Sequence, residues 1–190
     1  MGSIPTLIYC GGGNPAFYQI ATDYGFKYGS QLPATIYGPL YFAYQDWKNP
    51  NREKYMAALE QHRPHTATVL DWERIDPLEE VLSWAEEAAQ YVTKVVITPK
   101  VIGGIARLPH SIGGREVVLG YSVPTKYAGT DVPMWEFGGW PVHLLGGSPQ
   151  RQMQAYRYFP NVISIDGNMH MKVAVQRCQF WAPGNAFYAR

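Results

Sequence analysis

The sequence predicts an α/β protein, a compact and trimmed (β/α) barrel of the TIM type with parallel strands. Short, nearly continuous apolar runs recur along the chain, as in strands that are buried on both faces of a parallel sheet. Helical segments lie between several of these runs, and such alternation is typical of βα units. The 190 residues contain no linker or repeat, so we expect one domain over residues 1–190. An open doubly wound sheet is the alternative architecture.

The expected strands are seven runs rich in Val, Ile, Leu and Tyr, each followed by polar or glycine-rich residues that favour turns. They lie within residues 6–13, 34–47, 66–73, 94–101, 115–122, 140–148 and 161–168. None of them alternates strictly between apolar and polar residues, which again favours a sheet covered on both faces.

Three helices are expected between these strands, in residues 51–62, 76–92 and 148–159. In the second helix, Asp76 is the expected N-cap and Pro77 fits the first turn. In the third helix, Ser148 and Pro149 play the same two roles. The second helix also carries a single apolar stripe, which predicts that it packs on the sheet.

The charge of the chain is unevenly distributed, although the net charge is only +1. Residues 100–190 carry nine Lys and Arg against four Asp and Glu, whereas residues 1–99 are net acidic. One side of the protein could therefore hold a polyanion. The alternative is that these charges are scattered over a solvated surface. The candidates for phosphate contacts are Lys100, Lys126, Arg151, Arg157 and Lys172.

The two cysteines, Cys10 and Cys178, lie far apart and have no zinc-site spacing. We expect a reduced, cytoplasmic protein without a structural metal. The N-terminus does not resemble a signal peptide, and no apolar run reaches the roughly 18 residues that a membrane span needs.

Three acids follow the expected strands. Asp46, Asp71 and Asp166 each come at the carboxyl end of a run, and Trp47 and Trp72 stand beside two of them. Sites of parallel α/β folds lie at this end of the strands, so the three acids are candidates for one site. For each acid alone, the alternative is helix capping or turn formation.

Known nucleotide and hydrolase motifs are absent: the sequence has no G-x-G-x-x-G, no G-x-x-x-x-G-K-[ST] and no G-x-S-x-G. The segment "VHLLGGSPQ" could cradle a phosphate with the amides of Gly146 and Gly147 and a helix N-terminus, or it could be a tight turn. We expect His143 in this segment to face the interior or a neighbouring strand.

The order of "TATVLDWE" (66–73) and "HLLGGSPQRQMQAYRYFPNVISIDGN" (143–168) resembles the tRNA-guanine transglycosylase superfamily. Within it, the chain is most similar to the short phage and archaeal-virus members that insert 7-deazaguanines into DNA. The resemblance covers roughly residues 34–170 as sparse landmarks. The cysteine-rich zinc site and much of the length that contacts tRNA are missing, which favours DNA over tRNA as the substrate.

The resemblance implies roles for individual residues. Asp166 falls on the nucleophile, Asp71 on the acid that recognises the purine edge, and Asp46 on the acid that handles the proton of the base. After Asp46, however, Trp47-Lys48-Asn49 replaces the family's Ser-Gly-Gly. The other residues expected to bind substrate are Trp72, Lys100, Gly120, Tyr121, Gly146, Gly147 and Asn168, with Trp47, Trp72 or Tyr121 stacking on the base.

The implied activity is that of a DNA-guanine transglycosylase without a cofactor. It would replace guanine in DNA by a 7-deazaguanine, such as 7-cyano-7-deazaguanine, through a covalent Asp-glycosyl intermediate. The expected partners are DNA and the 7-deazaguanine base, with a homodimer left open. For a phage-encoded protein, the modification would protect DNA from restriction in the host cytoplasm.

Two other readings stay open. In the first, Asp46, Asp71, Glu73 and Asp166 hold Mg²⁺ in a (β/α) hydrolase or phosphodiesterase. In the second, the protein is a non-catalytic module that binds a nucleoside or a base.

Overall fold

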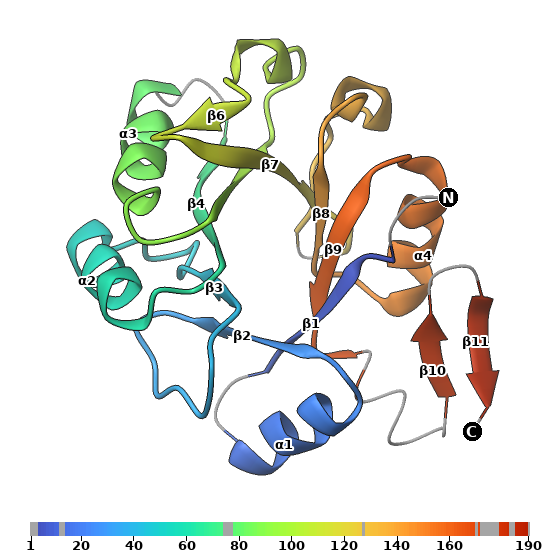
Figure 1. The fold of residues 1–190 in the computed structure, drawn as a ribbon. Helices are drawn as coiled ribbons and strands as arrows, with labels where there is room; N and C mark the ends of the chain where they lie inside the picture. Colours follow the sequence, from blue (N-terminus) through green and yellow to red (C-terminus); the bar gives the residue numbers. More distant parts are fainter. Residues whose placement is uncertain are drawn as a thin grey trace.

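Eight parallel strands close into a barrel in the computed structural model, which describes residues 4–11, 14–73, 78–126, 128–169, 171, 179–182 and 185–189. Each strand pairs with the next along the chain, and the pairs β1–β9 and β5–β7 complete the ring (Figure 1). The predicted (β/α) barrel is therefore confirmed, and the open sheet is excluded. The barrel strands are β1 (Thr6–Cys10), β2 (Lys27–Gln31), β3 (Phe42–Tyr44), β4 (Thr66–Trp72), β5 (Lys94–Pro99), β7 (Arg115–Ser122), β8 (Val142–Leu145) and β9 (Val162–Gly167).

Short antiparallel strands lie outside the ring. β6 (Ser111–Ile112) pairs with the start of β7 through a two-residue turn at Gly113 and Gly114. Both glycines have positive φ, 56° and 72°, which this type of hairpin turn requires. β10 (Gln179–Ala182) and β11 (Asn185–Ala189) form a separate two-stranded sheet.

The helices α1 (Pro15–Asp23), α2 (Arg52–His62), α3 (Leu78–Ala88) and α4 (Pro149–Tyr158) pack around the barrel. The N-caps are Asn14, Asn51 and, as predicted, Ser148, whose hydroxyl accepts a hydrogen bond from the amide of Arg151. The predicted cap Asp76 lies outside the described residues. None of the helices that the structure describes is long and apolar enough to cross a membrane.

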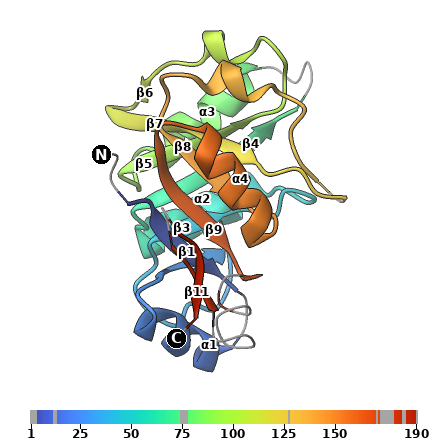
Figure 2. The same ribbon diagram turned by 90° about the vertical axis from the view of Figure 1, so that its right-hand side faces the viewer.

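The barrel is trimmed because several of its connections contain no α-helix. In the described part of the chain, β2–β3, β5–β7 and β7–β8 are joined without an α-helix. The β5–β7 connection contains the short 3₁₀ helix η1 (Ile105–Arg107) and β6, and the β7–β8 connection contains the 3₁₀ helix η2 (Met134–Phe137). Figures 1 and 2 show the helices α1–α4 against the outside of the barrel and the loops at its ends. Loops rather than helices therefore border much of the face where the strands end.

The side chains of the strands form two separate cores. The outward-facing residues pack beneath the helices, with Trp72, Tyr121 and Ile165 among them. The inward-facing residues fill the barrel itself and include Ile8, Cys10, Phe42, Val96 and Val118. This interior is narrow: a Cβ atom on Gly29 of β2 would lie 2.5 Å from the Cys10 sulfur.

Candidate active site

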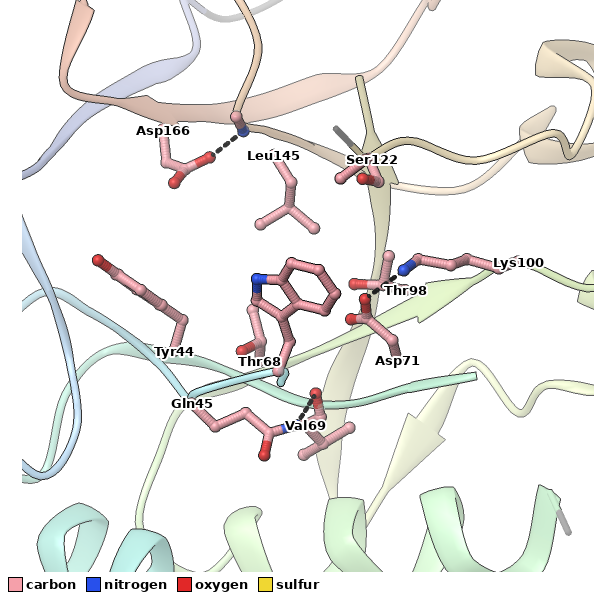
Figure 3. A pocket seen from close by; sticks show the side chains of 13 residues that line it. Tyr44, Gln45, Thr68, Val69, Asp71, Thr98, Lys100, Ser122, Leu145 and Asp166 are labelled. Carbon is pink, nitrogen blue, oxygen red and sulfur yellow. Dashed lines mark hydrogen bonds and ion pairs between the residues drawn. The ribbon is translucent and has the colours of Figure 1, made fainter. Parts of the chain in front are cut away.

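A cavity of about 250 Å³ opens at the carboxyl ends of the barrel strands. The sequence analysis predicted a site at this end of the barrel. It is close to the lower end of the range that small-molecule sites occupy, about 300–1,000 Å³. Figure 3 shows Asp166 on one side of this cavity and Asp71, Thr98 and Lys100 on the opposite side. The lining residues are Tyr44, Gln45, Trp47, Thr68, Val69, Asp71, Thr98, Lys100, Ser122, Ala128, Leu145, Gly146 and Asp166.

The carboxylate of Asp166 is buried and held at one oxygen. Its side chain points inward from the end of β9, and the residue is only 8% exposed. The amide of Gly146, which follows β8, donates a 2.8 Å hydrogen bond to Oδ1 of Asp166. Gly146 has a φ of +61°, a left-handed conformation that glycine adopts without strain. The glycine turn thus anchors the acid and leaves it facing the cavity (Figure 3).

Gln152 of α4 holds the backbone at Asp166 in place through hydrogen bonds. Its side-chain amide donates to the carbonyls of both Gly146 and Asp166, at 2.6 Å each, and the residue is fully buried. These bonds tie the ends of β8 and β9 together. Nothing in the sequence distinguishes Gln152 from the other glutamines of α4, so sequence analysis did not identify it.

Protonated side chains surround Asp166 on the barrel side. Burial and the neighbouring charge of Asp166 raise the pKa of the Cys10 thiol well above its usual range. Burial, with smaller contributions from Cys10 and Asp166, also raises the pKa of the Tyr44 phenol. Both groups therefore stay neutral at physiological pH, and neither adds a second negative charge beside the carboxylate.

An ion-pair cluster occupies the opposite wall. The ammonium group of Lys100 lies 2.8 Å from Oδ2 of Asp71 and also pairs with Glu73. Burial raises the pKa of Asp71, and Lys100 opposes this effect. For Lys100, burial alone would lower the pKa, but the two carboxylates raise it above its usual value. The wall therefore presents a hydrogen-bond acceptor and a charged donor next to each other.

Trp47 lies at the mouth of the cavity. It is 53% exposed, and the ammonium of Lys100 lies 5.8 Å from the centre of its ring. An indole that is not packed in the core keeps a free, flat face, and a planar ligand can stack on that face. Of the three aromatic residues predicted to stack, Trp47 is the one that lines the cavity.

The structure does not bring Trp72 or Tyr121 into this cavity. Both point to the outer face of their strands, with exposures of 1% and 4%, and pack in the core beneath the helices. Trp72 lies against Gly104 and Arg107, and Tyr121 packs edge-on against Phe137 and Phe159. The prediction that these two residues contact the base is therefore wrong for this cavity, because both side chains pack in the core instead.

Asp46 also lies outside the lining of the cavity. Its carboxylate accepts hydrogen bonds from the amide of Lys48 and the side chain of Asn49, and so closes a turn after β3. It lines a separate cavity beside α2. The geometry of this turn corrects the prediction that Asp46 handles the proton of a base in the same site as Asp166.

The predicted glycines and Asn168 have different positions. Gly146 lines the cavity, and Gly147 packs against Val123, where an added Cβ would lie 2.7 Å away. Gly120 faces the barrel interior below the lining, and a Cβ there would lie 2.6 Å from the hydroxyl of Thr98. Asn168 is exposed and is not among the lining residues.

The acids do not form a cation-binding cluster. Among the described residues, no three His, Cys, Asp or Glu side chains come together as metal ligands would. Asp71 and Glu73 are paired with Lys100, Asp46 closes its turn, and Asp166 stands on the opposite side of the cavity. The four acids suggested for Mg²⁺ are therefore not brought together as one ligand set.

The chain is similar to a family of proteins defined by sequence, and the family's model matches residues 21–188. The chain belongs to the DUF6610 family. This family is described as one of unknown function. Among curated proteins, none matches the chain.

Solved structures similar to this DUF6610 member include the phosphoribosyl anthranilate isomerase from Thermococcus kodakaraensis. Its TM-score is 0.50 at 15% sequence identity, over 85% of this chain and 87% of the isomerase. Monomers of the dimeric isomerase from Thermotoga maritima match with a TM-score of 0.38 at 13% identity, over 86% of each chain. At these identities the first similarity supports the barrel fold alone.

Proposed function

We propose that this protein is a base-exchanging glycosyltransferase that replaces guanine in DNA by a 7-deazaguanine. The observation that carries the proposal is Asp166, a buried carboxylate at a barrel strand end whose Oδ1 is held by the Gly146 amide. A carboxylate positioned on a rigid element is suited to attack the anomeric carbon of a sugar. The resemblance to guanine transglycosylases assigns the same role to this residue.

The reaction has two displacements at the same carbon. In the first, an oxygen of Asp166 bonds to the anomeric carbon, the bond from carbon to guanine nitrogen breaks, and the departing base takes up a proton from water. In the second, the nitrogen of the incoming base bonds to that carbon, the ester bond to Asp166 breaks, and the proton of the incoming base passes to water. The backbone of the DNA stays intact throughout.

The wall opposite Asp166 supports guanine as the base. Asp71 can accept from the ring N–H and the amino group of guanine, while Lys100, 2.8 Å from it, can donate to the neighbouring carbonyl oxygen. Adenine instead has an acceptor at N1, an amino donor at C6 and only a hydrogen at C2, so it does not match these two side chains. We expect the cavity of about 250 Å³ to take a single base, so the nucleotide must be single-stranded or flipped out of the duplex.

The test is incorporation of labelled guanine into DNA, followed by nucleoside analysis with candidate 7-deazaguanines. We expect exchange by the wild type, in the presence of a chelator as well, and a loss of more than about 10³-fold in Asp166→Asn. Asp131→Asn, which removes an exposed carboxylate outside the cavity, is the matched control.

Three results would contradict the proposal. Exchange by Asp166→Asn at the wild-type rate would exclude the nucleophile. Activity that is lost in chelator would favour the Mg²⁺-dependent hydrolase. Base binding without exchange and without a covalent adduct on Asp166 by mass spectrometry would favour the non-catalytic module.

A further inference from the structure

His143 is a buried, polar side chain in the centre of the barrel, directly below the candidate nucleophile. It points inward from β8, is fully buried, and its ring lies 4.6 Å from that of Phe42. One ring nitrogen, Nδ1, lies 2.7 Å from the hydroxyl of Ser164 on β9. The other, Nε2, lies 3.6 Å from Oδ1 of Asp166 and has no hydrogen-bond partner within the part of the chain that the structure describes.

This arrangement selects one tautomer of the ring. If Nδ1 carried the proton, the lone pair of Nε2 would face the carboxylate in a water-poor interior, where such repulsion is strong. If Nε2 carries the proton, its N–H dipole points toward Asp166 and the Ser164 hydroxyl donates to Nδ1. The hydrogen on a serine hydroxyl rotates freely to suit its partner, so the second arrangement keeps the hydrogen bond between Ser164 and Nδ1 and places the proton of the ring on the nitrogen nearer the carboxylate.

We propose that His143 is a positioning residue for Asp166, held by Ser164 in the tautomer with the proton on Nε2. This inference rests on the proposed function and extends it to the choice of the attacking oxygen. The amide of Gly146 donates to Oδ1, and the N–H of His143 lies nearest the same oxygen. Because Oδ1 is held by these two groups, Oδ2 is the oxygen that bonds to the sugar. At 3.6 Å the contact in the free protein is electrostatic and longer than a hydrogen bond.

The same donors act in the second displacement. Once Oδ2 is bonded to the anomeric carbon, Oδ1 becomes the carbonyl oxygen of the ester. As the ester breaks, negative charge returns to the carboxylate, and the donors of Gly146 and His143 stabilise that charge at Oδ1. His143 therefore contributes to turnover and makes no contact with the base or with DNA.

The kinetic test compares His143→Leu with His143→Gln, whose amide can still donate toward Asp166. We expect the leucine variant to lower the rate of guanine exchange by about 10–100-fold, as partners that orient metal ligands do, without changing the KM for the base or the affinity for DNA. The glutamine variant should recover part of the loss. A loss that is equal in both variants and accompanied by lower thermal stability would indicate a structural role and overturn the proposal.

The second measurement is the ¹⁵N NMR spectrum of the His143 ring in the unliganded protein, which does not depend on activity. We expect a pyrrole-type shift at Nε2 and a pyridine-type shift at Nδ1, with this preference weakened in Ser164→Ala and in Asp166→Asn. A proton on Nδ1 would overturn the positioning role, even if the wild type exchanges bases. If the wild type does not exchange bases, the proposed function fails, while the spectrum still decides whether His143 directs its proton to Asp166.

Discussion

Two carboxylates on opposite sides of the cavity have different surroundings. Asp166 is anchored by a neutral amide and has protonated neighbours, whereas Asp71 is paired with the cation of Lys100. A carboxylate without a cationic partner keeps its charge available for attack on an electron-poor carbon. A carboxylate next to a lysine instead offers paired acceptor and donor groups. The two acids on opposite sides of one small cavity are thus suited to different tasks.

The raised pKa of Asp71 leads to a prediction about pH and stability. Burial makes the folded protein bind this proton more tightly than the unfolded chain does. The contribution of Asp71 to the free energy of unfolding is therefore fully present below about pH 4 and declines as pH rises through the folded-state pKa. We expect Asp71→Asn to gain stability relative to the wild type as the pH rises above about 4.

Urea unfolding of both proteins at several pH values measures this difference, with Asp131→Asn as the exposed control. If the difference moved in favour of the wild type as pH rises, the attraction of Lys100 would outweigh burial, and the pKa of Asp71 would be lowered instead. The same variant should bind free guanine more weakly, and DNA nearly as well as the wild type does.

At the level of single residues, the sequence predicted which strand ends carry the site but not which way each side chain points. Asp71 and Trp72 are neighbours on β4, so only one of them can face the barrel. A shift in the pairing of β4 with β5 between Thr68 and Asp71 changes the alternation along the strand. Such irregularities arise from the fit between two strands, and the residues of one strand do not reveal them.

The elements that were predicted correctly carry strong local signals. The third expected helix has Ser148 as a cap and Pro149 in its first turn, and α4 begins at Pro149. The strand β2, with the sequence KYGSQ, was missed because it has no apolar run. Only Tyr28 packs outward, and Gly29 fits the narrow barrel beside Cys10.

The expected strand at 34–47 is shorter in the structure, where β3 covers only Phe42–Tyr44 and a loop precedes it. The helix α1 was missed, although Asn14 and Pro15 provide the usual start signals.

The cap of α2 allows a prediction at the scale of one element. The side chain of Asn51 accepts a 3.0 Å hydrogen bond from the amide of Lys54, which has no partner within the helix. We expect Asn51→Ala to lower the free energy of unfolding by about 1 kcal/mol, and Asn51→Asp to lower it by much less. Chemical denaturation of the three proteins measures this. Equal stability of Asn51→Ala and the wild type would mean that water satisfies the Lys54 amide equally well.

For the whole molecule, the barrel decides which of the basic residues can act together. α4 starts at the mouth of the barrel after β8 and runs back toward the start of β9 (Figure 1). Arg151 lies in the first turn of α4, five residues after Gly146 of the cavity lining, and Arg157 lies in the last turn. Six residues of helix separate them by about 9 Å along the axis. Arg157 therefore lies farther along α4 from the carboxyl ends of the strands than Arg151 does, and Lys172 lies outside the described residues.

This separation provides a matched pair of variants for DNA binding. If DNA lies across the mouth of the barrel, Arg151 neutralises a phosphate and releases a counterion, whereas Arg157 does not. We expect affinity to fall steeply as salt rises, and the slope of log affinity against log salt to decrease by about one in Arg151→Ala. Arg157→Ala should keep the wild-type slope. The Arg151 side chain also donates a hydrogen bond to the Pro124 carbonyl, so the thermal stability of each variant is measured as well.

Equal slopes for both variants would place the DNA elsewhere on the surface. An affinity that hardly depends on salt would instead favour a free nucleoside as the substrate, because a nucleoside carries no phosphates to neutralise.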